Sequence, residues 1–146
     1  MNILVSKCLL GENCRYCGDN CKNDKVLALG KRHTLVGICP EQDGGLPTPR
    51  LPAERVGERV LAKDGSDVTR QYNEGAHLAL AAAKQYEIAF AVLKAKSPSC
   101  GKGVIYDGSF TGAKTKGNGV TAQLLLDNGY TVYTEDDLED NFEYKK

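Results

Sequence analysis

The cysteines are the residues of this chain with the most chemical potential. The sequence has 146 residues and contains six cysteines, against two histidines and no tryptophan. Cys8, Cys39 and Cys100 are far apart in the sequence, and each lies where an apolar run gives way to a loop. Three thiolates with no obvious fourth protein ligand favour a metal centre with an open coordination position. Iron–sulfur clusters are the soft centres that thiolates typically hold.

The alternative interpretation of these three cysteines is structural. Free cysteines are often small buried apolar residues without a chemical role. Their positions favour the metal centre, because each lies near a glycine or a proline at the start of a loop.

A second group of cysteines lies within one short loop, as Cys14-x-x-Cys17-x-x-x-Cys21. This tight spacing is typical of metal ligands, and Cys8 could serve as a fourth ligand. Three interpretations stay open: a structural zinc site, a cluster held in this loop, and a redox pair that forms when two of these thiols are oxidised.

One acidic residue lies close in sequence to the dispersed cysteines, the name used below for Cys8, Cys39 and Cys100. Glu41 follows Cys39 by two residues, beyond a proline. A carboxyl group beside an apolar pocket can act as a proton donor, because desolvation favours its neutral form. The plainer alternative is an acid exposed to solvent on a loop.

Apolar runs and glycine or proline breaks predict the elements that must position these residues. A helix over about 68–87 is the clearest, with Asp67 as its N-cap and Tyr72, Ala76, Leu80 and Ala83 on its core face. A helix over 120–129 has Asn118 as the candidate N-cap. Predicted strands cover 2–10, 33–41, 88–95 and 130–135, a short helix covers 25–32, irregular loops cover 42–57 and 103–119, and a small hairpin covers 58–68.

The alternation of strands and helices predicts an α/β fold. We expect one Rossmann-like, three-layer domain over residues 1–146, with a parallel or mixed sheet of about four strands and a short charged tail from about residue 136. In open parallel sheets ligands bind beyond the carboxyl ends of the strands. Because Cys8, Cys39 and Cys100 each follow a predicted strand, we expect the three thiols to converge at one edge.

The composition excludes several other classes of protein. Lysine plus arginine and aspartate plus glutamate are balanced at 19 each, which gives little reason to expect binding to nucleic acid or membrane surfaces. No apolar run is long enough to span a bilayer. The chain starts with an apolar strand and no basic leader, so we expect a cytoplasmic protein, and a secreted disulfide framework fits poorly.

Several motifs resemble one known family. They are "ILVSKCLLG", "NCRY", "CPE", "GGLPTPR", "AKSPSCG", "YDGSFTG" and "GNGVTAQLL". Together they resemble the domain of unknown function numbered 523, the family that includes the thiouracil desulfurases (desulfidases). The resemblance covers about the first 135 residues. It implies an enzyme that replaces the C=S group of a small thiolated base or nucleoside, of the thiouracil or thiouridine type, by C=O and releases sulfide.

The resemblance also implies roles for individual residues. It implies a [4Fe–4S] cluster on Cys8, Cys39 and Cys100, with Glu41 and Ser97 as the catalytic acid and hydroxyl. We expect a cluster with an exposed iron to be lost when the protein is purified in air. Relatives usually read like "RYDGGN" where this chain has Cys17 and Cys21, so these two thiols are additions. They leave a rival interpretation, a non-enzymatic metal-binding or sulfur-carrier module built on Cys14, Cys17 and Cys21.

Overall fold

The computed structural model describes residues 1–138 and shows a parallel α/β sheet. Four strands lie in the order β2-β1-β5-β8, and every neighbouring pair is parallel, which confirms the α/β fold predicted with a parallel or mixed sheet. Because β1 lies between β2 and β5, the carboxyl ends of these three strands are neighbours. The strands are β1 (Asn2–Ser6), β2 (Thr34–Ile38), β5 (Phe90–Leu93) and β8 (Val132–Thr134).

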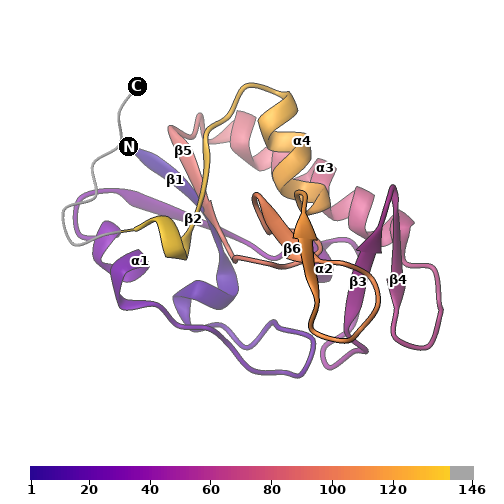
Figure 1. Cartoon of the computed structure of the whole chain (residues 1–146). Coiled ribbons are helices and arrows are strands. Elements are labelled where there is room, and N and C mark those ends of the chain that lie inside the picture. Colours follow the sequence, from indigo (N-terminus) through magenta and orange to yellow (C-terminus); the bar gives the residue numbers. More distant parts are fainter. Residues whose placement is uncertain (139–146) are drawn as a thin grey trace.

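Helices cover both faces of the sheet and give three layers (Figure 1). On one face, Leu80 and Leu125 pack against Leu4 and Leu93 of the sheet. On the other face, Val26 packs against the opposite side of the strands. The helices are α1 (Asp24–Leu29), α2 (Pro40–Asp43), α3 (Thr69–Gln85) and α4 (Val120–Asp127), with 3-10 turns η1 (Lys7–Leu10) and η2 (Glu135–Asp137).

The core face predicted for the longest helix is correct. Tyr72, Ala76, Leu80 and Ala83 of α3 are all buried. This face also makes the contact that matters for the site, because α3 packs tightly on α2. A Cβ atom at Gly75 would lie only 1.8 Å from the carbonyl oxygen of Pro40, so no larger residue allows this approach.

The two predicted N-caps are wrong. Val68 precedes α3 as its N-cap, and Asp67 instead accepts a hydrogen bond from the Thr69 N–H. At α4 the N-cap is Gly119, and the Asn118 side chain accepts from the Gly103 N–H. Loop carbonyl groups outcompete a side-chain cap at α4, as described for the site below.

Two short hairpins lie in segments where the sequence predicts mainly loops. Strands β3 (Ala53–Val56) and β4 (Arg59–Ala62) are antiparallel and form the first hairpin. The predicted hairpin over 58–68 was therefore misplaced, because its first strand lies inside the predicted loop over 42–57. Helix α2 occupies the end of the predicted strand over 33–41, which stops at Ile38, and the start of the predicted loop over 42–57. Strands β6 (Val104–Tyr106) and β7 (Lys114–Lys116) form the second hairpin, within the predicted loop over 103–119. The hairpins lie side by side at one end of the molecule (Figure 1).

The C-terminal region is described only in part. The turn η2 follows β8, and residues 139–146 of the predicted charged tail lie outside the described residues. Over residues 1–138, no helix is both long enough and apolar enough to cross a bilayer.

Candidate active site

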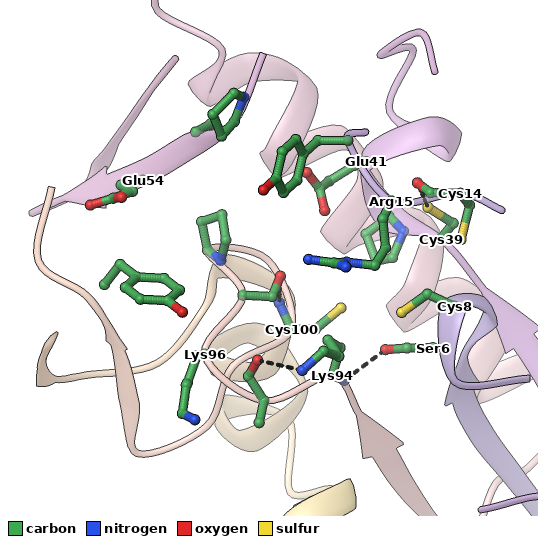
Figure 2. Close-up of a pocket in the computed structure, with 18 of the residues that line it drawn as sticks. Ser6, Cys8, Cys14, Arg15, Cys39, Glu41, Glu54, Lys94, Lys96 and Cys100 are labelled. Carbon is green, nitrogen blue, oxygen red and sulfur yellow. Dashed lines mark hydrogen bonds between the residues drawn. The ribbon is translucent and has the colours of Figure 1, made fainter. Parts of the chain in front are cut away.

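The three dispersed cysteines line one pocket. Cys8 follows β1 within η1, Cys39 follows β2 directly, and Cys100 lies in the loop after β5. All three are at least nine-tenths buried, and the pocket has a volume of about 510 Å³. Figure 2 shows their sulfur atoms facing a common space. The parallel order of β2, β1 and β5 therefore produces the convergence expected from the sequence.

Cys39 and Cys100 lie in surroundings that disfavour their charged forms. Burial raises the pKa of Cys100 to about 12, although a hydrogen bond with Ser6 opposes the increase. A hydrogen bond with Cys14 and burial both raise the pKa of Cys39 well above its ordinary value. The protein alone thus keeps these thiols neutral, and a bound metal centre would supply the positive charge that thiolate ligands need.

Cys14 is a fourth thiol in the same pocket. It is buried, and its carbonyl oxygen accepts a hydrogen bond from Sγ of Cys39 at 3.8 Å. A hydrogen bond with Cys39 lowers the pKa of Cys14, but one with Cys8 and burial outweigh it and raise the pKa to about 11. Cys14 therefore belongs with the dispersed cysteines.

The loop thiols predicted as a second site do not gather in one place. Cys17 is exposed and Cys21 is half-buried, and only Cys14 of the three lines the pocket. Within residues 1–138, no three His, Cys, Asp or Glu side chains are grouped so as to hold a single metal ion. The second metal or redox site stays a prediction from the sequence.

Glu41 lies in the pocket wall and is held from two other elements. The hydroxyl of Tyr72, in α3, donates a hydrogen bond to Oε1 of Glu41 at 2.5 Å. Nη2 of Arg50 lies 3.5 Å from the same oxygen. Burial, together with the Glu41 charge, raises the pKa of Tyr72 far above its ordinary value, so the phenol remains a proton donor at neutral pH. The interpretation of Glu41 as a solvated loop acid does not fit these contacts.

Arg50 is the buried residue that connects this wall to the cysteine loop. Its Nη2 donates to the carbonyl of Cys14 at 2.9 Å, and its Nη1 donates to Oγ1 of Thr48 at 2.9 Å. Its backbone N–H donates to the carbonyl of Tyr16 at 2.7 Å. A buried guanidinium with several acceptors fixes the segments that it joins. Arg50 therefore sets the position of Glu41 relative to Cys14.

Ser97 organises the loop that carries Cys100. Its Oγ accepts hydrogen bonds from the N–H groups of Ser99 and Cys100, both at 3.1 Å. Ser97 also lines the pocket. Because the oxygen already accepts two hydrogen bonds, the proton of the hydroxyl is the part that remains free to be donated to a ligand.

The loop with Cys100 is also fixed to the first turn of α4. The N–H groups of Val120 and Thr121 donate to the carbonyl groups of Pro98 and Ser99, at 2.9 Å and 2.8 Å. The buried hydroxyls of Ser99 and Thr121 are 2.9 Å apart. The loop thus satisfies the free N–H groups of the helix terminus, which explains why Asn118 is not needed as a cap.

A lysine that the sequence analysis did not single out lies beside the thiols. Nζ of Lys94, at the end of β5, forms an ion pair with Oε2 of Glu135 at 2.8 Å and lines the pocket next to Cys100 (Figure 2). Burial alone would lower the pKa of Lys94, but Glu135 outweighs this effect and raises it. Lys94 thus remains a cation at the sulfur-rich end of the pocket. In the sequence, the only sign of this role for Lys94 was its position directly after an apolar run.

The donor set fits an iron–sulfur cluster. The thiols of Cys8, Cys39 and Cys100 come from three separate segments and share one buried space, with Ser97 and Glu41 on the same pocket. Soft thiolate ligands suit iron–sulfur clusters, and three of them leave one coordination position for a further ligand.

Comparisons with known proteins agree with this site. The 2-thiouracil desulfurase family matches residues 3–137. An uncharacterised protein of Bacillus subtilis (strain 168), YbbK, is 44% identical over 148 residues, covering 94% of this chain and 98% of its own length. A solved structure of a [4Fe–4S]-dependent thiouracil desulfidase, TudS (DUF523Vcz), has a TM-score of 0.89 and 47% identity, over 94% of this chain and 92% of that chain.

Proposed function

The chain belongs to the 2-thiouracil desulfurase family, and we propose that its pocket is the active site of a [4Fe–4S]-dependent desulfidase. The reaction converts a thiocarbonyl compound and water into the corresponding carbonyl compound and hydrogen sulfide. The C=S bond breaks, a C=O bond forms, and no net electron transfer takes place.

Cys8, Cys39 and Cys100 are the residues that would hold the cluster. When bound, the cluster supplies an iron without a protein ligand, which is a soft Lewis acid suited to the sulfur of a thiocarbonyl group. Two features of the chain prepare this site. Ser6 and Ser97 hydrogen-bond the strand-end loops, and burial keeps the thiols away from solvent.

Glu41 and Ser97 would carry out the proton transfers. The carboxylate of Glu41 can take a proton from the attacking water, because Tyr72 and Arg50 both contact its Oε1 and hold the group in place. The hydroxyl of Ser97 can donate its proton to the substrate, because its lone pairs are engaged by backbone N–H groups.

We propose a small thiolated base or nucleoside as the substrate. A pocket of about 510 Å³ accommodates a small heterocycle together with a cofactor. The balanced charge of the chain favours a small molecule over an intact nucleic acid. We place the enzyme in the cytoplasm, where thiols are kept reduced, since all six cysteines are free.

The observation that carries this proposal is the convergence of three buried thiols from β1, β2 and β5 on a pocket shared with Glu41 and Ser97. Anaerobic reconstitution with iron and sulfide tests it. We expect about four irons per chain, with a broad visible absorption that is lost in Cys39→Ala and kept in Cys17→Ala.

The same experiment addresses the rival metal-binding or sulfur-carrier module on Cys14, Cys17 and Cys21. If that module were the function, Cys17→Ala would lose the absorption and Cys39→Ala would keep it. This outcome would contradict the proposed site.

A further inference from the structure

The tip of the β6–β7 hairpin carries a residue in a costly backbone conformation. Phe110 has a φ angle of 58°, in the left-handed region that favours glycine. A bulky aromatic residue keeps such a conformation only where the surrounding structure imposes it, and residues of this kind cluster at functional sites. Phe110 lines the same pocket as Ser97 and Cys100.

Glu54, in β3, holds Phe110 in this position. Its Oε1 accepts hydrogen bonds from the N–H groups of Gly108 and Phe110, at 2.9 Å and 3.2 Å. Gly108, in the second hairpin, fits closely against β3 of the first, because a Cβ atom at Gly108 would lie 2.5 Å from Cγ2 of Val56. The first hairpin therefore fixes the tip of the second.

Glu54, which binds the backbone of Phe110, marks the end of the pocket away from Cys8 and Cys39. Figure 2 shows Glu54 on the side of the pocket opposite Cys8 and Cys39. Pro52, Pro98 and Tyr106 line the pocket together with Phe110 and supply further apolar surface. A ligand that reacts at the thiol end would extend its ring toward this surface, and flat heterocycles pack favourably on aromatic rings.

We propose that Phe110 is a substrate-contact residue, whose ring forms the wall on which the thiolated heterocycle packs. Glu54 is its positioning residue. This inference rests on the proposed function and adds the part of the pocket that recognises the ring.

The test compares Phe110→Gly, Phe110→Tyr and Glu54→Ala with wild-type protein, all reconstituted anaerobically and assayed for sulfide release from 2-thiouracil. Glycine removes the ring and also relieves the left-handed conformation. We expect Phe110→Gly to unfold at the wild-type temperature or above it, while its KM rises roughly tenfold and its kcat changes less.

Phe110→Tyr should keep the wild-type KM. Glu54→Ala should raise KM with unchanged iron content, and Thr115→Ala, on the exposed β7, serves as the control.

A KM within twofold of wild type in both Phe110→Gly and Glu54→Ala would overturn the inference. A fall in unfolding temperature with an unchanged KM would also overturn it, because Phe110 would then be structural. Neither result would affect the proposed function, which is tested separately by sulfide release from the reconstituted wild-type protein.

Discussion

The hydroxyl of Tyr72 lies 2.5 Å from Oε1 of Glu41 and donates a hydrogen bond to it. The two residues are 31 positions apart, and they meet because α2 packs directly on α3 at Gly75. A carboxylate in the pocket wall is thus fixed by the longest helix of the fold, which is itself part of the core.

Tyr72→Phe should lower kcat roughly tenfold or more, because a hydrogen bond to a charged group is worth about 1.5–3 kcal/mol and the change leaves Glu41 less well held. Iron content should not change. The measurement is the steady-state rate of sulfide release at neutral pH. Tyr86→Phe, at the exposed end of the same helix, is the matched control and should behave as wild type. Equal rates in both variants would show that the Tyr72 hydroxyl does not support catalysis.

The stability of the fold should depend on the ionisation of Tyr72. Its pKa is raised in the folded state above the ordinary value of 10.0, mainly by burial, so unfolding favours loss of the proton. The stabilisation is therefore complete below pH 10 and is lost as the pH rises above it. Denaturant titrations between pH 8 and about 11.5 should show the free energy of unfolding falling more steeply for wild type than for Tyr72→Phe. Parallel curves would disagree with the burial of this phenol.

Ser97→Ala should retain the cluster but reduce kcat by about 10²–10⁴-fold, since it removes the donated proton from the pocket. The cluster is retained because the bonds between the Cys100 loop and α4 remain. Iron analysis and kinetics are read on the same sample, and Ser97→Thr, which keeps a hydroxyl, should recover part of the rate. Full activity in Ser97→Ala would assign the proton transfer to another group.

Glu135→Ala should destabilise the protein by about 3 kcal/mol, because it leaves the Lys94 ammonium unpaired in a partly buried position. It also removes the acceptor of the Ala95 N–H, which lies 2.7 Å from Oε1 of Glu135. Thermal and urea unfolding measure the loss, with the exposed neighbour changed in Asp136→Ala as the control. A change below about 0.5 kcal/mol, the range typical of surface sites, would show that this pair contributes little.

The strands and the convergence of Cys8, Cys39 and Cys100 were predictable, because apolar runs ending in loops carry that information and parallel strands share an edge. The β6–β7 hairpin was not predicted, since Lys114–Lys116 is exposed and has no apolar alternation. The hairpin contacts β3, and Glu54 of β3 binds the N–H of Gly108 near its tip, which are tertiary contacts without a local signal.

The contacts around Glu41 could not have been read from the sequence. The sequence pattern indicates only that Tyr72 lies on the core face of a helix and that Arg50 ends a proline-rich segment. Their meeting depends on the close packing of α2 and α3, which is a tertiary contact with no local signal. The same holds for Cys14, whose loop spacing pointed to Cys17 and Cys21 and whose actual neighbours are Cys39 and Cys8.

The most direct test of the central claim is the stoichiometry of the reaction. Anaerobically reconstituted protein is incubated with 2-thiouracil and no reductant, and sulfide and uracil are both quantified over time. We expect one sulfide and one uracil for each 2-thiouracil consumed, with neither product formed by Cys39→Ala. Absence of sulfide release by wild-type protein with a full complement of iron, or a requirement for added electrons, would contradict it.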